Sequence, residues 1–169
     1  MKIKDNRDEF VSLTANKEIW DDVLNNSVRG AVLSAAAAFE VSLERLLKSF
    51  LVQGVSSSKN IAEKSNFSHK INLCFSLGLI TEKEKDDLNT LREIRNAFAH
   101  NIFGCDFKNS EVQKFVRALK LPLSINFPRD NIRNFFNIGM IMLDTSLSDR
   151  LKRITPINQR PNLVYSHGA

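Results

Sequence analysis

Cysteine, histidine, glycine and proline are all scarce in this chain of 169 residues, and each scarcity excludes a kind of protein. Only six glycines and four prolines interrupt the chain, and no stretch alternates like a β-strand. The two cysteines, Cys74 and Cys105, are too few for a disulfide framework, and the apolar run around Cys74 predicts a buried thiol. The three histidines, at positions 69, 100 and 167, do not have the spacing of metal ligands. We therefore expect neither a metal ion nor a cofactor.

Long hydrophobic runs are missing as well. The longest apolar stretch, AVLSAAAAF at residues 31–39, is too short and too rich in alanine to span a bilayer. The first residues carry several charges with no apolar run behind them, which is not the pattern of a signal peptide. The composition, 43% hydrophobic and 25% charged, is that of an ordinary soluble domain. We expect a cytoplasmic protein that has no contact with a membrane.

Acidic residues are scarce in one part of the chain. Residues 1–107 hold 14 basic and 15 acidic side chains, whereas residues 108–169 hold 10 basic and 4 acidic ones, a net charge of +6. A basic segment of this kind favours polyanions, nucleic acid above all. The alternative interpretation is a solvated basic surface with no specific partner.

Helical periodicity is present along nearly the whole chain. Thr81 and Glu84 have the spacing of a capping box, which predicts that a helix begins at residue 82. Gly78 is expected to end the helix before it. The expected helices occupy residues 5–25 (as one helix or two), 29–53, 69–78, 82–101, 110–120 and 129–152, with a short helical piece after the turn at 54–60.

These helices predict an all-α, single-domain bundle of about five to six helices over residues 1–154. The segment LPLSINFP, residues 121–128, is expected to be an extended connector. Residues 155–169 are expected to form a loose tail.

The segment LREIRNAFAH, residues 91–100, ends the helix that follows the capping box. At 100° per residue, one face of this helix carries the apolar side chains that should hold it to the core: Leu88, Leu91, Ile94 and Phe98. A second face carries a polar stripe of Arg92, Asn96 and His100 at intervals of four residues. Arg95 lies between the two faces, at the edge of the core.

Two interpretations of this polar stripe are open. In the first, the stripe is a solvated helix face and Arg95 forms an ion pair, with Glu40 as a candidate partner. In the second, Arg95, Asn96 and His100 together cleave RNA. Histidine titrates near neutrality and can transfer the proton of a 2′-hydroxyl, arginine binds phosphate oxygens where charge develops, and asparagine can orient the imidazole. Because one helix supplies only one histidine, two copies of the chain would have to meet in a homodimer.

The heptapeptide IRNAFAH resembles the R-N-x-x-x-H signature of the HEPN superfamily, whose members are small all-α proteins. Many HEPN proteins are metal-independent endoribonucleases of toxin–antitoxin, abortive-infection and CRISPR systems. The resemblance implies that Arg95 and His100 are catalytic and that Asn96 supports them, with the sites facing each other in a homodimer cleft. Glu40 and Arg92 are the candidate supporting residues.

A longer stretch, FSHKINLCFSLGLITEKEKDDLNTLREIRNAFAH at residues 67–100, is similar to the mannitol operon repressor (MtlR-like) family, as is FEVSLERLL at residues 39–47. This resemblance covers roughly residues 30–120 and implies a helical core of about residues 28–120. It also implies a module without a standard DNA-binding motif, which regulates through a protein partner.

The sequence therefore leaves two functions open. The first is a dimeric HEPN-type endoribonuclease that acts on RNA in a bacterial toxin–antitoxin or defence context, with an antitoxin as its protein partner. The second is a non-catalytic MtlR-like transcriptional regulator or adaptor that acts through protein–protein contacts.

Overall fold

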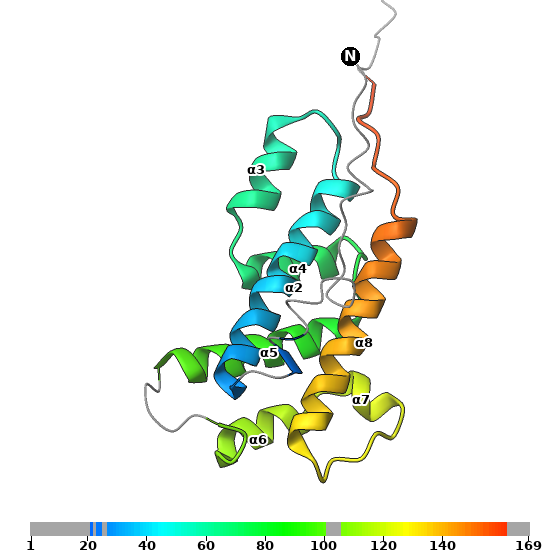
Figure 1. The fold of residues 1–169 in the computed structure, drawn as a ribbon. Helices are drawn as coiled ribbons and strands as arrows, with labels where there is room; N and C mark the ends of the chain where they lie inside the picture. The colour runs from blue at the N-terminus through cyan, green and yellow to red at the C-terminus, as the bar shows by residue number, and fades with distance from the viewer. Residues whose placement is uncertain (1–20, 22, 25–26, 101–105, 162–169) are drawn as a thin grey trace, which may run out of the picture.

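Seven helices are present in the part of the chain that the computed structural model describes, which comprises residues 21, 23–24, 27–100 and 106–161 (Figure 1). They are α2 (Val28–Phe50), α3 (Ser56–Lys64), α4 (Phe67–Ser76), α5 (Glu82–His100), α6 (Ser110–Arg117), α7 (Lys120–Ser124) and α8 (Ile132–Arg153). The described residues contain no β-strand, which confirms the predicted all-α class. The opening helix expected at residues 5–25 lies largely outside them. None of the described helices has the length and apolar content that crossing a bilayer requires.

Helix α2 packs against α3, α4, α5 and α8, so it is central to the bundle. It begins after Ser27, whose side chain accepts a hydrogen bond from the amide of Gly30 at 3.1 Å. Small residues face the core, since Ala31, Ala35 and Ala36 are buried. The neighbouring helices can therefore approach the backbone of α2 closely.

The connection between α4 and α5 confirms two local predictions. Gly78 has φ +71°, a left-handed conformation that glycine adopts freely, and the amide of Leu79 donates to the carbonyl of Cys74 at 2.8 Å. Thr81 and Glu84 form the predicted capping box, because the Glu84 carboxylate accepts from the Thr81 amide and the Thr81 hydroxyl accepts from the Glu84 amide. As a result, α4 ends and α5 begins where the sequence indicated.

Helix α7 corrects a prediction. The connector expected to be extended at residues 121–128 begins instead inside a short helix, Lys120–Ser124. The carboxylate of Asp87, on α5, accepts hydrogen bonds from the amides of Lys120 and Leu121, the latter at 2.9 Å. These are the first amides of α7, which have no partner within their own helix. With α7 and the short α3, the described residues hold seven helices rather than the predicted five or six.

Helix α7 also packs closely on α8, and Gly139 makes this approach possible. A Cβ atom at Gly139 would lie 3.0 Å from Cδ1 of Leu119 and 3.2 Å from Cγ of Pro122. Both of these side chains are buried. The short helix is therefore held from two sides, by the Asp87 carboxylate and by the surface of α8.

The other end of α8 is tied to the start of α5. The guanidinium of Arg150 lies 3.1 Å from the buried carboxylate of Glu84, which also accepts a hydrogen bond from the hydroxyl of Ser146. After α8 the chain is coil through residue 161, and the amide of Ile157 donates to the carbonyl of Phe50 at 2.8 Å. The coil after α8 is thus joined to the end of α2 by a backbone hydrogen bond.

Candidate functional site

The motif Arg95-Asn96-x-x-x-His100 lies on the last turns of α5, and the core face of this helix is as predicted. Leu91, Ile94 and Phe98 are completely buried. Helix α5 packs against α2, α4, α6 and α7, which together supply the apolar surface that these side chains contact. Packing of this face accounts for the position of the helix and leaves the polar motif residues on its remaining surface.

The polar stripe is less exposed than the helical spacing predicts. Arg92 and Asn96 are half-buried, and the side chain of Arg92 retains 31% of its exposure. The Arg92 guanidinium lies 2.6 Å from the carboxylate of Glu93, and its Nε atom is buried with no hydrogen-bond partner in the described part of the chain. The spacing within one helix takes no account of cover from neighbouring helices. At Arg92 and Asn96 the stripe is therefore a partly covered helix face.

Arg95 is half-buried, consistent with its predicted place at the edge of the core. Its guanidinium forms no ion pair or hydrogen bond with any residue that the structure describes. The ion pair with Glu40 that the first interpretation expected is absent, because the carboxylate of Glu40 lies 3.8 Å from Nζ of Lys70 instead. Arg95 therefore keeps a positive charge that no described carboxylate neutralises.

His100 is the last residue of α5. Its side chain lies outside the part of the structure that is described. The expectation that Asn96 orients the His100 imidazole therefore stays a prediction, and so does the expectation that two such sites meet in a homodimer.

Glu40 takes part in an ion-pair network that joins α2 to α4 and α3. Nζ of Lys70, whose side chain is only 4% exposed, lies 2.9 Å from the carboxylate of Glu44. Glu44 also pairs with Lys48 at 2.8 Å, and Lys48 pairs with Glu63 at 2.9 Å. Burial raises the pKa of Glu44, but the hydrogen bonds and charges of the two lysines outweigh burial and lower it overall. This network stabilises the packing of three helices.

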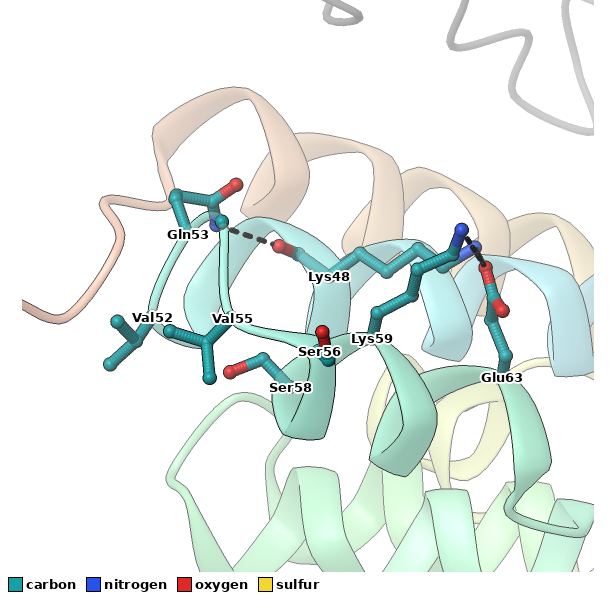
Figure 2. Close-up of a pocket in the computed structure, with 9 residues that line it drawn as sticks. Lys48, Val52, Gln53, Val55, Ser56, Ser58, Lys59 and Glu63 are labelled. Atoms are coloured by element: carbon teal, nitrogen blue, oxygen red, sulfur yellow. Dashed lines mark hydrogen bonds and ion pairs between the residues drawn. The ribbon is translucent and has the colours of Figure 1, made fainter.

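Two cavities lie in other parts of the described chain. The larger, of about 520 Å³, opens between the end of α2 and the start of α3, where Lys48, Lys59 and Glu63 lie along one side (Figure 2). A second, of about 370 Å³, lies between α2, the α4–α5 turn and α8, and is lined in part by Arg150 and Arg153. No residue of the motif lines either cavity.

The described residues contain no group of three or more histidine, cysteine, aspartate or glutamate side chains that could hold a metal ion. Cys74 is completely buried, as predicted, and burial raises the pKa of its thiol to about 12. Cys105 lies outside the described residues.

Asp87 is a structural residue that the sequence alone did not reveal. It is completely buried, and burial raises the pKa of its carboxyl to about 6, although the amides of Lys120 and Leu121 act in the opposite direction. The sequence does contain one signal for it. Asp87 lies four residues before Leu91 and seven before Ile94, so helical spacing places this acid on the core face.

No protein-family model and no curated protein matches this sequence. Among solved structures, similarity is found to MtlR in the X-ray structure of the MtlR–HPr complex from Escherichia coli. The TM-score is 0.62 at 14% sequence identity, and the match covers 79% of this chain and 97% of that chain. A match of this extent at such low identity shows a shared fold. The chain therefore has the MtlR-like helical fold that the resemblance at residues 67–100 implied.

Proposed function

We propose that this chain is a regulatory adaptor that acts by binding another protein. The observation that carries this proposal is the MtlR-like fold, because the similar chain was crystallised as a complex with HPr. The match covers 97% of that chain, so nearly all of its helical framework has a counterpart here. Since a fold does not fix a function by itself, the proposal concerns the class of partner, a protein, with HPr as the first candidate.

The geometry around the motif supports a non-catalytic role. Two residues with candidate supporting roles in catalysis have structural partners instead, since Arg92 pairs with Glu93 and Glu40 pairs with Lys70. The Glu40–Lys70 pair joins α2 to α4 and the Arg92–Glu93 pair lies within α5, and neither pair requires a substrate.

The proposal is tested by direct binding. The purified chain is expected to form a complex with HPr of its own organism, measured by titration calorimetry. Chemical cross-linking in cells, followed by purification of the chain, identifies any other protein bound to it, which is then purified and titrated in the same way. If neither HPr nor any cross-linked protein binds the purified chain, the adaptor function is wrong.

A second candidate function is metal-independent RNA cleavage by a homodimer, and Arg95 is the observation that favours it. This arginine is half-buried on α5 and carries a charge that no described carboxylate neutralises, as a phosphate-binding residue would. In this hypothesis Arg95 stabilises charge on the phosphate, His100 transfers protons and Asn96 orients the imidazole.

RNA cleavage by the purified chain in EDTA tests this candidate. Cleavage is expected to disappear in Arg95→Ala and His100→Ala and to persist in Lys83→Ala, a control at an exposed position of the same helix. If expression of the chain arrests growth, the first two substitutions should relieve the arrest. A wild-type protein that leaves RNA intact, or variants that cleave as fast as the wild type, would exclude the nuclease.

A further inference from the structure

We infer that the surface formed by α6, α7 and the loop before α8 binds an acidic segment of a partner protein that also carries an apolar side chain. We call this the α6–α7 basic surface and define it by Lys114, Arg117, Lys120, Ile125 and Arg129. The inference rests on the proposed adaptor function and adds the place and the chemistry of the contact.

The exposed cations of this surface form no ion pair in the described part of the chain. Between residues 107 and 129 the sequence holds five lysine or arginine side chains and a single acid, Glu111. Lys114, Arg117 and Lys120 are exposed, and none of them forms an ion pair with a described residue. The lysines of the α2–α3–α4 network are paired with glutamates, as the 2.9 Å contacts at Lys48 and Lys70 show. Three exposed cations that form no ion pair with a described residue therefore follow one another closely along α6 and α7.

These cations lie on two consecutive helices at one end of the bundle. Lys114 and Arg117 are three residues apart on α6, opposite the buried side chains of Val112 and Val116. Lys120 begins α7 directly after the two residues that connect the helices. Figure 1 shows α6 and α7 at the lower end of the bundle, on either side of the first turns of α8.

An apolar side chain lies within this charged segment. Ile125 follows α7 and is 54% exposed, more than any other large hydrophobic side chain identified as exposed in the described residues. The turn that carries it is fixed, because Asn126 has φ +54° and the amide of Phe127 donates to the carbonyl of Pro122 at 3.1 Å. An apolar residue with charges around it is typical of protein interfaces, whereas a nucleic-acid backbone offers phosphates and little apolar surface. The combination favours an acidic protein segment over RNA.

The surface is held in place before any partner binds. The Asp87 carboxylate binds the first amides of α7, and Leu119 and Pro122 pack against Gly139 of α8. Binding therefore orders little backbone, which lowers the entropic cost of association.

The inference is tested with three defined probes added to the isotopically labelled full chain, followed by NMR. The probes are a synthetic peptide of glutamates around two leucines, the same peptide with serines in place of the leucines, and a single-stranded RNA. The leucine peptide is expected to shift the signals of residues 114–125 and to bind more tightly than the serine peptide, with an affinity that falls as salt is added. RNA that binds as tightly as the leucine peptide would overturn the inference, as would shifts confined to other helices.

Matched variants distinguish the effect of this surface on peptide binding from the effect of the net charge of the chain. Lys114→Glu, Arg117→Glu and Lys120→Glu together should weaken peptide binding about tenfold or more, since each removes a favourable charge and adds a repulsive one. The control changes three other exposed cations by the same charge: Lys64→Glu, Lys152→Glu and Arg160→Glu. Ile125→Ser should remove the preference for the leucine peptide. Equal weakening by the control variant would overturn the inference.

Failure of this inference can be distinguished from failure of the adaptor function. If a protein partner binds the wild type and binds the triple variant at Lys114, Arg117 and Lys120 equally well, this surface is the wrong one while the adaptor function stands. If no protein partner exists but the peptide result holds, the adaptor function fails by itself.

Discussion

Asp87 is an acid with no exposed surface, and its carboxylate has two amide donors from α7. These donors favour the ionised form, but the loss of water around the buried carboxyl has the larger effect and raises its pKa to about 6. At neutral pH the protein therefore keeps this group ionised at a cost in free energy. In return, the amides that begin a short helix gain a partner.

Titration of Asp87 should appear in the pH dependence of stability. Because its pKa in the folded chain lies above the ordinary value of 3.8, the folded state binds the proton more tightly than the unfolded state does. The stabilisation that results from the raised pKa is fully present below the ordinary pKa of 3.8. It is lost as the pH rises through about 6. On this basis it amounts to at most about 3 kcal/mol.

Urea unfolding of the wild type and of Asp87→Asn, from about pH 4 to about pH 7.5, measures this contribution. The free energy of unfolding of the wild type relative to the variant should fall with rising pH, because the asparagine does not titrate. A difference that stays constant over this range would show that Asp87 has the same pKa in both states.

For individual side chains, the sequence predicted the buried residues of the motif helix better than its polar ones. Leu91, Ile94 and Phe98 are buried because the packing of a helix follows its own periodicity. The half-burial of Arg92 and Asn96 depends on neighbouring elements, which the spacing within α5 does not contain. The site is therefore predictable in its position on the helix and not in its exposure.

Among the helices, α4 and α5 were predictable because their end signals lie in their own sequence. Gly78 ends one, and the Thr81–Glu84 capping box begins the other. Helix α7 was not predictable in this way, since its N-terminal amides are capped by Asp87, which lies 33 residues before Lys120 in the chain. Such a helix exists because of tertiary contacts, and local propensity does not reveal it.

Gly139 should be sensitive to substitution for the same reason. Gly139→Val places methyl groups where a Cβ alone would already lie 3.0 Å from Leu119 and 3.2 Å from the rigid ring of Pro122. We expect the free energy of unfolding to fall by about 2 kcal/mol or more, since overpacking forces α7 away from α8. Thermal and urea unfolding measure the change, and Thr145→Val, at an exposed position of α8, is the control. Equal stability of the two variants would mean that α7 does not depend on this contact.

Among the described residues, the ion-pair network of α2, α3 and α4 and the α6–α7 basic surface lie in different parts of the bundle. The end formed by α2, α3 and α4 carries the ion-pair network around Lys70 and Lys48, whereas the exposed cations of α6 and α7 form no ion pair with a described residue. Charges at the first end contribute to stability, and those of the α6–α7 basic surface are the ones that we infer to bind a partner. The division follows the sequence, whose acidic residues are scarce after residue 107.

Substitutions at the two ends should therefore differ in their effect on stability. Lys70→Ala removes a nearly buried cation from Glu44 and Glu40 and should lower the free energy of unfolding by about 2 kcal/mol. Lys70→Met keeps the packing of the side-chain stem and should lower the free energy of unfolding less. Lys114→Ser with Arg117→Ser should change it by no more than about 0.5 kcal/mol. Urea unfolding at low salt measures these values. A larger loss at the second pair of positions would contradict the division.

The hydrogen bonds between Asp87 and α7 also determine where the chain can be cut. Trypsin cleaves after lysine and arginine, and Lys120 is an exposed residue whose next peptide bond leads directly to Leu121. A protease needs an extended segment, so cleavage there requires the helix to leave the Asp87 carboxylate first. Protection of one peptide bond thus follows from a carboxylate on another helix, and the rate of tryptic cleavage after Lys120 reports how often the two separate.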